Sequence, residues 1–328
     1  MRVYKVGVLG ATGAVGQEMI RILEERRFPV GTLFPLASAR SAGKTIEFAG
    51  ESVPVCEATE ASFTGLDFVF GATSATVSRA FAPAIRASGA LYIDNASAFR
   101  LNDDVPLVVP ELNATDALCH HGIIANPNCV TILALTAIGG LSHLSPIRSL
   151  RVTTFQAVSG AGAGGMAALE AETRGETEAL SPFPYPIAGN LIPQIGAFDE
   201  DGWTAEEKKL LYEGRKILHA PSLRVSCTCV RVPILRCHSM AITVETETPI
   251  PLSLARQAIA SSKGCALVDD PARRRYPMPL DASGRDLVLV GRVRRDLAEE
   301  TAITLFCCGD QLRKGAALNA VQIAEIFA

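Results

Sequence analysis

Short apolar runs and amphipathic helical patterns alternate over roughly the first 130 residues of the chain. Runs of alternating or continuous apolar residues are typical of strands, whereas apolar positions three or four residues apart are typical of helices. The pattern predicts strands at Val3–Gly10, Thr32–Ala37, Phe68–Gly71, Leu91–Asp94 and His121–Ala125, and helices at Val15–Arg27 and Val77–Ala87. Strands that alternate with helices indicate a parallel sheet with crossover helices.

The pattern changes near Cys129, after which an apolar helix is expected over Val130–Ile138. Long β-branched runs follow, with few helical patterns between them, at Ser149–Phe155, Arg224–Val232, Ala241–Thr248, Asp286–Val293 and Ala302–Cys307. They predict a mainly antiparallel sheet with one or two helices. The proline-rich stretch 181–190 fits neither a helix nor a central strand, so we expect a loop there. The last stretch, 312–327, reads as an amphipathic helix.

The expected fold class is therefore α/β, with a Rossmann-type parallel-sheet domain and an α+β domain built mainly on an antiparallel sheet. The 328 residues, 48% of them hydrophobic, suffice for two cores. A net charge of −3 implies no surface for nucleic acid or anionic membrane. The first residues lead directly into a strand and no apolar run reaches about 18 residues, so we expect no signal peptide and no membrane span.

The cysteines bear on location and on metal binding. Nine of them, an odd number without a framework spacing, favour a reducing cytosol over a secreted disulfide protein. Cys227 and Cys229, like Cys307 and Cys308, lie within strand patterns without a second pair at zinc spacing, so we interpret them as core residues. The cluster 119–121 is more consistent with solvated histidines at a helix end. We expect a cytoplasmic protein without a bound metal.

Cys129 is the residue whose position most favours chemistry. It follows Asn126, Pro127 and Asn128 between a strand pattern and an apolar helix, so it falls in the first helical turn. The first-turn N–H groups are unpartnered and the helix dipole favours negative charge, which promotes a thiolate and could hold an oxyanion. The alternative is a buried structural cysteine at a helix start.

A glycine-rich turn follows the first strand pattern and opens the first helix pattern, as a dinucleotide-binding turn requires. It comprises Gly10, Ala11, Thr12, Gly13, Ala14, Val15 and Gly16. Its spacing is GxxGxxG rather than GxGxxG, and glycines also occur in such turns for packing alone. A bound dinucleotide is the preferred interpretation.

The end of the second strand pattern bears on which dinucleotide is bound. An NAD site places an acidic residue about twenty residues after the glycines, for the ribose hydroxyls. This sequence instead has Ser38, Arg40, Ser41 and Lys44, with no acid before Glu47. Hydroxyls and cations could hold a 2′-phosphate, although a solvated basic loop is the alternative. We therefore expect NADP, with Thr73 on the same carboxyl edge of the sheet.

A thiolate beside a hydride carrier suggests aldehyde or acyl oxidation–reduction through a thioester, which needs an acid/base. His238 has the most suggestive setting of the five histidines, although a plain core or surface histidine is as consistent. Arg231 and His238 would lie on opposite faces of one flat strand. A bend at Pro233 could bring both into one pocket.

The helix start at Thr204 offers two neighbouring carboxylates. Thr204 and Glu207 form a capping-box pattern. Glu206 is not needed for capping and shares a helix face with Lys209. From the residues alone, the preferred interpretation of Glu206 and Lys209 is an ordinary surface ion pair.

Taken together, the chain resembles the aspartate-β-semialdehyde dehydrogenase family. The matching segments run in order from end to end: 10–16, 38–44, 94–100, 108–113, 127–129, 155–162, 231–239 and 314–325. The resemblance implies that Cys129 is the nucleophile, His238 the acid/base and Gln156 the residue that orients the substrate. It further implies that Arg231 binds the substrate carboxylate and Glu206 its amino group, while Arg100, Asn128 and Lys209 form the phosphate site. Ser159, Gly160 and Asn319 are expected near the nicotinamide.

The resemblance implies the NADPH-dependent reduction of L-aspartyl-4-phosphate to the semialdehyde, a step toward lysine and diaminopimelate, methionine and threonine. One alternative is the reductase for N-acetyl-glutamyl phosphate. The other is a non-catalytic NADP-binding paralogue, which should lack the nucleophile or the acid/base. The expected domains are 1–128 with 313–328 for NADP, and 129–312 for catalysis and dimerisation. The expected partners are the substrate, inorganic phosphate and a second copy in a homodimer or tetramer.

Overall fold

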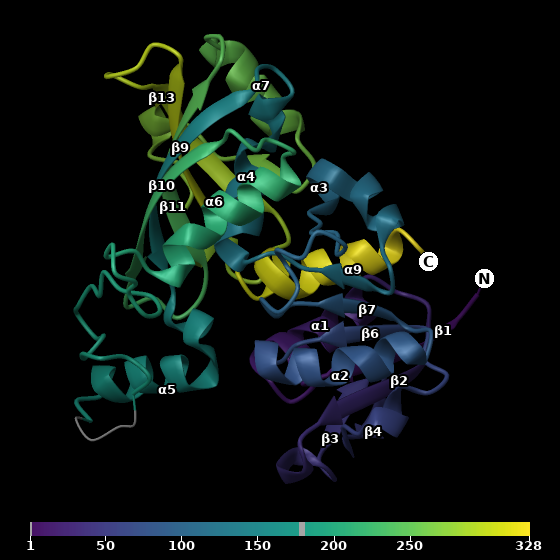
Figure 1. The fold of residues 1–328 in the computed structure, drawn as a ribbon. Helices are drawn as coiled ribbons and strands as arrows, with labels where there is room; N and C mark the ends of the chain where they lie inside the picture. Colours follow the sequence, from purple (N-terminus) through teal and green to yellow (C-terminus); the bar gives the residue numbers. More distant parts are fainter. Residues whose placement is uncertain (1, 177–180) are drawn as a thin grey trace. The chain divides into compact units, whose positions relative to one another are not determined.

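The structure is a computed structural model that describes residues 2–176 and 181–328. The chain divides into two compact units, one of residues 1–128 with 316–328 and the other of residues 129–315 (Figure 1). We expected the chain to return to the first unit at residue 313, whereas the structure places the return at Ala316. Arg313 belongs to the second unit, where its guanidinium pairs with Asp286 at 2.7 Å.

The first unit is built on a parallel six-stranded sheet with the order β5-β2-β1-β6-β7-β8. The strands are β1 (Tyr4–Leu9), β2 (Val30–Ala37), β5 (Cys56–Glu57), β6 (Phe68–Gly71), β7 (Leu91–Asp94) and β8 (Ile123–Ala125). The helices are α1 (Ala14–Glu25), α2 (Ala75–Ala87), α3 (Pro110–Asn113) and α9 (Leu318–Glu325), and β3 (Thr45–Phe48) pairs with β4 (Glu51–Pro54) as a hairpin. The parallel sheet with crossover helices is confirmed.

Side chains of the first unit pack on both faces of its parallel sheet. Val6 and Val8 of β1 pack with Met19 of α1 and with Leu318 and Val321 of α9 in one apolar cluster. Leu91 and Ile93 of β7 belong to the same cluster, whereas Tyr92 between them donates a hydrogen bond to Ser78 of α2 at 3.0 Å. Both faces of the sheet are therefore covered, as parallel sheets require.

The C-terminal segment differs from the expected amphipathic helix. A π-helical turn at Arg313–Ala317 precedes the α-helix Leu318–Glu325. Most residues of α9, Asn319 included, are buried, because the helix lies within the core rather than on its surface. Its hydrophobic face is therefore not limited to one stripe.

The second unit contains a mixed six-stranded sheet with the order β10-β9-β11-β14-β13-β12. Its strands are β9 (Ile147–Gln156), β10 (Arg224–Arg231), β11 (His238–Thr246), β12 (Cys265–Leu267), β13 (Val288–Arg295) and β14 (Ala302–Gly309). The three central pairings are antiparallel, as predicted. The two outer strands, β10 and β12, pair in parallel, because helix-containing crossovers connect them to their neighbours.

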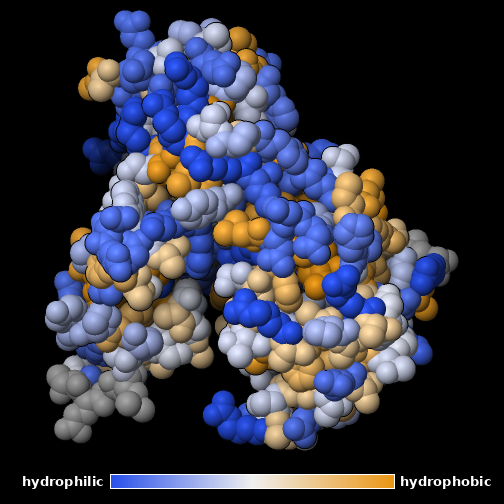
Figure 2. Space-filling model, viewed as in Figure 1, coloured by the Kyte–Doolittle hydropathy of each residue, from blue (hydrophilic) through white to orange (hydrophobic). Residues whose placement is uncertain are grey.

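The helices of the second unit are α4 (Cys129–Ser142), α5 (Gly162–Thr173), α6 (Ala205–Ile217), α7 (Leu252–Ser261) and α8 (Pro279–Ala282). Residues 130–141 of α4 are all buried, which explains its continuous apolar sequence. The stretch 181–190 has neither helix nor strand, as expected. Small groups of hydrophilic and hydrophobic side chains mix on the face drawn in Figure 2, as is normal for a folded surface. Within the described residues, no helix is long and apolar enough to cross a membrane.

Candidate active site

Cys129 is the first residue of α4, so the prediction that it lies in the first helical turn is confirmed. Its side chain is partly accessible, whereas the rest of the helix through Leu141 is buried. An ideal Cβ on Gly315 would come within 3.2 Å of the Cys129 Cβ, so a side chain there would crowd the cysteine. The first-turn position and the glycine leave this thiol approachable, unlike that of a core cysteine.

His238 is the first residue of β11 and is fully buried. Its Nδ1 accepts a hydrogen bond from the Ala157 N–H at 3.1 Å, which assigns the proton of the neutral ring to Nε2. That Nε2 lies 3.5 Å from the Gln156 amide nitrogen. Burial and the positive charge of Arg231 lower the pKa of His238 to about 3, against a smaller opposite effect of Glu206. The ring is therefore neutral near pH 7.

Arg231 ends β10 and is 6% exposed. The sequence left open whether Arg231 and His238 share one strand. The structure places them on different strands, β10 and β11, and their side chains meet at Gly160. An ideal Cβ on Gly160 would come within 2.8 Å of Arg231 Nη1 and 3.2 Å of the His238 ring. Only glycine leaves both side chains in place.

The Arg231 guanidinium has little internal compensation. It donates one hydrogen bond, from Nη1 to the Ala157 carbonyl at 2.6 Å, and no carboxylate among the described residues pairs with it. Burial lowers its pKa, and the charges of Cys129 and Glu206 act in the opposite direction. A buried, unpaired cation is costly unless an anion binds beside it. The position is suited to a substrate carboxylate.

Gln156 and Glu206 complete this polar cluster. Gln156 ends β9 and donates from its amide nitrogen to Glu206 Oε1 at 3.3 Å. Glu206 Oε2 pairs with Lys209 Nζ at 2.7 Å. The expected ion pair is present, but it is not an ordinary surface pair, because the Glu206 side chain is 9% exposed and that of Lys209 31%.

Glu207 has the capping role that the sequence predicts. Its carboxylate accepts from the Thr204 N–H at 2.8 Å, and its own N–H donates to the Thr204 hydroxyl at 3.3 Å. The same carboxylate accepts from the Cys229 N–H at 3.1 Å, which satisfies a donor on the edge strand β10. Glu207 therefore holds α6 and β10 together, while Glu206 faces the polar cluster.

Gln311 belongs to this site but was missed from the sequence. Its Oε1 accepts from the Cys237 N–H at 2.8 Å, and its Nε2 donates to the Ser159 hydroxyl. Cys237 precedes His238 and has a φ of 79°, an uncommon conformation for a residue with a side chain. The bond from Gln311 therefore fixes the backbone just before the acid/base candidate. The one sequence signal that could have marked it is a polar residue shortly after the predicted strand Ala302–Cys307.

In the first unit, the glycine-rich turn is compact. Gly10 has a φ of 90°, and an ideal Cβ there would lie 2.3 Å from the Ala72 carbonyl oxygen. An ideal Cβ on Gly16 would lie 2.2 Å from the Gly10 oxygen. Gly10 and Gly16 are thus required by packing, whereas Gly13 is the N-cap of α1 and has no side-chain cap. The N–H groups of Ala14 and Val15 begin the helix at a position suited to a phosphate.

The side chains around this turn fit a nucleotide phosphate. The Thr73 hydroxyl is buried without a hydrogen-bond partner among the described residues, and its methyl group lies near Gly10. The Thr12 hydroxyl donates to the Ser41 hydroxyl at 3.4 Å, which connects the turn to the end of β2. Ser38 and Arg40 are exposed beside Ser41, and the described residues give Arg40 no ion pair. The donor set is therefore cationic and hydroxyl-rich.

Arg100, Asn128 and Asn319 are buried in the first unit. Arg100 donates to the carbonyls of Asn126 at 3.0 Å and Asn95 at 2.7 Å. The Asn319 amide nitrogen donates to the Val108 carbonyl at 2.9 Å and to Asn126 Oδ1 at 2.7 Å. Asn126 thus connects Arg100 and α9, and its contribution was not expected from the sequence. The amide nitrogen of Asn319 is committed to this network.

The comparisons with known proteins agree with this geometry. Residues 5–120 match the family model "Semialdehyde dehydrogenase, NAD binding domain" and residues 139–314 match "Semialdehyde dehydrogenase, dimerisation domain". The aspartate-semialdehyde dehydrogenase of Synechocystis sp. is 48% identical over 98% of this chain and 97% of its own, and that of Aquifex aeolicus is 44% identical over 99% and 98%.

Solved structures give the same result. Aspartate semialdehyde dehydrogenase II of Vibrio cholerae, complexed with ASA, matches with a TM-score of 0.96 and 40% identity over 100% of this chain and 98% of that one. The Candida albicans enzyme with NADP matches with a TM-score of 0.76 and 26% identity over 99% and 98%. On its sequence, its two-unit fold and these full-length matches, the chain belongs to the aspartate-semialdehyde dehydrogenase family.

Proposed function

We propose that the protein catalyses the NADPH-dependent reductive dephosphorylation of L-aspartyl-4-phosphate to L-aspartate-4-semialdehyde, a step toward lysine and diaminopimelate, methionine and threonine. The single observation that carries the proposal is the cluster in the second unit. There a buried Arg231 without a carboxylate partner, a neutral His238 and the Gln156–Glu206 pair occur together. This cluster offers a cation for a carboxylate, a carboxylate for an amine and an acid/base for an acyl group.

In the proposed mechanism the Cys129 thiolate attacks the acyl phosphate, phosphate leaves, and a thioester forms. NADPH supplies the hydride that reduces the thioester when the cofactor is bound. His238 exchanges a proton with the acyl oxygen as the thiohemiacetal forms and collapses, which releases the Cys129 thiolate. Gln156 orients the acyl group, Arg231 binds the α-carboxylate and Glu206 the α-amino group. Lys209, with Arg100 and Asn128, binds the phosphate.

The preference for NADP is supported by the residues at the end of β2. Ser38, Arg40 and Ser41 occur where an NAD site carries an acid. The rest of NADP is proposed to contact the turn from Gly10 to Gly16, Thr73, and the segment Ser159–Gly160 of the second unit. Asn319 is proposed near the nicotinamide, held in place by the two hydrogen bonds of its amide nitrogen.

Replacement of Arg40 by alanine tests the cofactor assignment. The variant is expected to bind NADP more weakly by about 1.5–3 kcal/mol, because a hydrogen bond to a charged group is lost, while NAD binding is nearly unchanged. Titration of both cofactors by protein fluorescence measures the two dissociation constants. Arg21→Ala, on the outer surface of α1, is the control. An equal loss for both cofactors in Arg40→Ala would show that Arg40 does not bind the 2′-phosphate.

Replacing the two neighbouring carboxylates of α6 by alanine should have different effects, on stability for Glu207 and on catalysis for Glu206. Glu207→Ala is expected to lower the free energy of unfolding by about 2–4 kcal/mol, because it removes the capping box and leaves the Cys229 N–H unsatisfied. Its kcat/KM should change little at a temperature where the protein stays folded. Glu206→Ala should instead reduce kcat/KM with a smaller loss of stability. Urea unfolding and steady-state kinetics measure both, and the reversed pattern would contradict the assignment.

The second unit is proposed to associate with a second copy, as a homodimer or a tetramer. Helices α4, α6 and α7 of this unit pack against its sheet, and α4 contacts β9, β11, β13 and β14. Some side chains of the central strands are only partly buried, namely Thr153, Phe155, Thr243 and Phe306. Antiparallel sheets can leave one face in water, but aromatic side chains such as Phe155 and Phe306 on that face are suited to contact with a second copy of the chain. The description of the matching family model, a dimerisation domain, supports the proposal.

One assay distinguishes this function from its alternatives. We expect phosphate-dependent reduction of NADP with L-aspartate semialdehyde and little with N-acetylglutamate semialdehyde. Glu206 favours the first substrate, because a free amine prefers a carboxylate partner. The non-catalytic alternative predicts no turnover of either substrate. It is disfavoured by the presence of Cys129, Gln156, Arg231 and His238. The cytoplasmic location stays a prediction from the sequence.

A further inference from the structure

We propose that Phe183 is a specificity-determining residue, which holds the Arg231 guanidinium ready for the substrate carboxylate and limits the direction from which that carboxylate can bind. The inference rests on the proposed function, in which Arg231 binds a carboxylate. It adds a residue from the proline-rich loop at 181–190, to which the proposed mechanism assigns no role.

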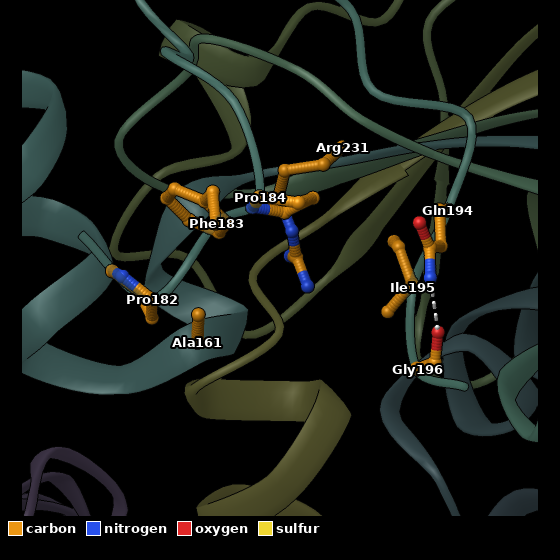
Figure 3. A pocket seen from close by; sticks show the side chains of 8 residues that line it. All are labelled: Ala161, Pro182, Phe183, Pro184, Gln194, Ile195, Gly196 and Arg231. Carbon is orange, nitrogen blue, oxygen red and sulfur yellow. Dashed lines mark hydrogen bonds between the residues drawn. The ribbon is translucent and has the colours of Figure 1, made fainter.

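Phe183 lies directly on the arginine. Its ring centroid is 5.7 Å from Arg231 Cζ, within the range of a cation–π contact. Both residues line a cavity of about 510 Å³, together with Pro182, Pro184 and Ile195. In Figure 3 the Arg231 side chain points into this cavity, with Phe183 on one side and Ile195 on the other. The cavity therefore offers space for a small anion beside the guanidinium.

The loop that carries Phe183 is anchored at two points. The Glu172 carboxylate of α5 accepts hydrogen bonds from the N–H groups of Ile187 at 2.6 Å and Ala188 at 2.8 Å. Ile192 forms two main-chain hydrogen bonds with Arg231 itself, of 2.8 and 3.0 Å. Phe183 packs against the small apolar cluster of Val158, Leu169, Ile187 and Ile192. These contacts therefore fix the position of the Phe183 ring relative to Arg231.

The chemistry explains why an aromatic residue suits this position. A buried guanidinium needs compensation before the substrate arrives, yet an acidic side chain would pair with it and compete with the substrate. An aromatic face stabilises the cation without occupying its N–H donors. Nη1 is already bonded to the Ala157 carbonyl, and Cζ lies over the Phe183 ring. The side of the guanidinium next to the ring is therefore occupied, and a carboxylate has to reach the remaining N–H groups from another side, where bidentate pairing is possible.

The test compares two aldehydes that differ only in the carboxylate: L-aspartate semialdehyde and its decarboxylated analogue 3-aminopropanal. For Phe183→Leu we expect the KM for L-aspartate semialdehyde to rise about 2- to 30-fold, the range that a cation–π contact supplies. The kcat/KM for 3-aminopropanal and the KM values for phosphate and NADP should stay within about twofold of wild type. Phe183→Tyr keeps the ring and should restore the wild-type KM. Tyr185→Leu, an exposed aromatic residue of the same loop, is the matched control.

Three outcomes would overturn the proposal: an unchanged KM in Phe183→Leu, an equal loss for both aldehydes, or no rescue by tyrosine. An equal loss for both aldehydes with a lowered melting temperature would show that Phe183 only supports the fold. Failure of the proposed function is seen separately, in the wild-type protein. If the wild type turns over N-acetylglutamate semialdehyde instead, the proposed function is wrong. The Phe183 variants can then be tested on that substrate, which also carries a carboxylate.

Discussion

Replacement of Cys129 by alanine is expected to abolish turnover of L-aspartate semialdehyde while NADP affinity stays within about twofold of wild type. The thiolate forms the covalent bond to the substrate, so no other group in the site can replace it. Cys129→Ser is expected to be almost inactive as well, because a hydroxyl stays protonated where a thiol at a helix start ionises. Initial rates of NADP reduction measure turnover, and protein fluorescence measures cofactor binding.

The other cysteines provide the control for this experiment. Cys56 and Cys119 are exposed and lie outside the catalytic cluster, so alanine at either position should leave the rate nearly unchanged. Alkylation of the wild-type protein by iodoacetamide should inactivate it through Cys129, and prior binding of substrate should slow that inactivation. Turnover that survives in Cys129→Ala would disprove the thioester mechanism. Loss of activity in Cys119→Ala would show that thiol replacement damages the protein in general.

Replacement of His238 by asparagine is expected to reduce kcat by about 10²- to 10⁴-fold, the range lost with a general acid/base. Asparagine can keep an acceptor near the position of Nδ1, where the Ala157 N–H donates, but it removes Nε2. The KM for phosphate should change little. Rapid-quench measurement of the acyl-enzyme step and steady-state kinetics check the result. A variant that keeps the wild-type kcat would exclude His238 as the acid/base.

The same variant gives a defined change in the pH dependence of stability. Burial, then the charge of Arg231, lowers the pKa of His238 to about 3 from 6.5. As the pH falls below 6.5, His238 therefore takes up a proton in the unfolded chain but stays neutral in the folded protein. The contribution of His238 to the free energy of unfolding is fully present above pH 6.5 and is lost progressively down to about pH 3. Between about pH 7.5 and 5 the wild type should therefore lose about 2 kcal/mol of unfolding free energy, and His238→Asn should not show this loss.

Substrate binding should act on His238 in the opposite direction. A carboxylate paired with Arg231 would offset the positive charge that lowers the pKa of the histidine. The imidazole then accepts a proton more readily in the complex than in the free enzyme. The pH profile of kcat should accordingly show a higher pKa for this group than the profile of kcat/KM.

Much of the fold was predictable because local patterns decided it. The alternation of apolar runs and helical patterns gave the parallel sheet of the first unit, and β-branched runs gave the central antiparallel strands of the second. The chemistry was predictable where a side chain depends on its immediate neighbours. Cys129 owes its position to the helix that begins there, and Glu207 owes its capping role to Thr204 three residues earlier.

The rest depends on contacts between distant segments, which a single sequence does not show. Gln311 meets Cys237 and Ser159 only because the end of β14 returns beside them. The sequence left open whether Arg231 and His238 share one strand, and the structure shows that two strands, β10 and β11, bring them together at Gly160. The stretch 312–327 was expected to be an amphipathic helix, but most of α9 is buried. Asn319 is one of its polar residues, and its amide nitrogen is hydrogen-bonded inside the core.

The place of α9 has a consequence for how the protein is made. The second unit is one continuous stretch, residues 129–315, whereas the first unit needs residues 316–328 to complete its core. During synthesis, the first unit therefore cannot complete its core until residues 316–328 have left the ribosome. Until then, apolar residues such as Val6 and Met19 lack part of their packing. Domains usually finish folding in the order of their synthesis. Here the unit that starts the chain is the last to be completed, so nascent chains halted just before α9 should be the form most dependent on chaperones.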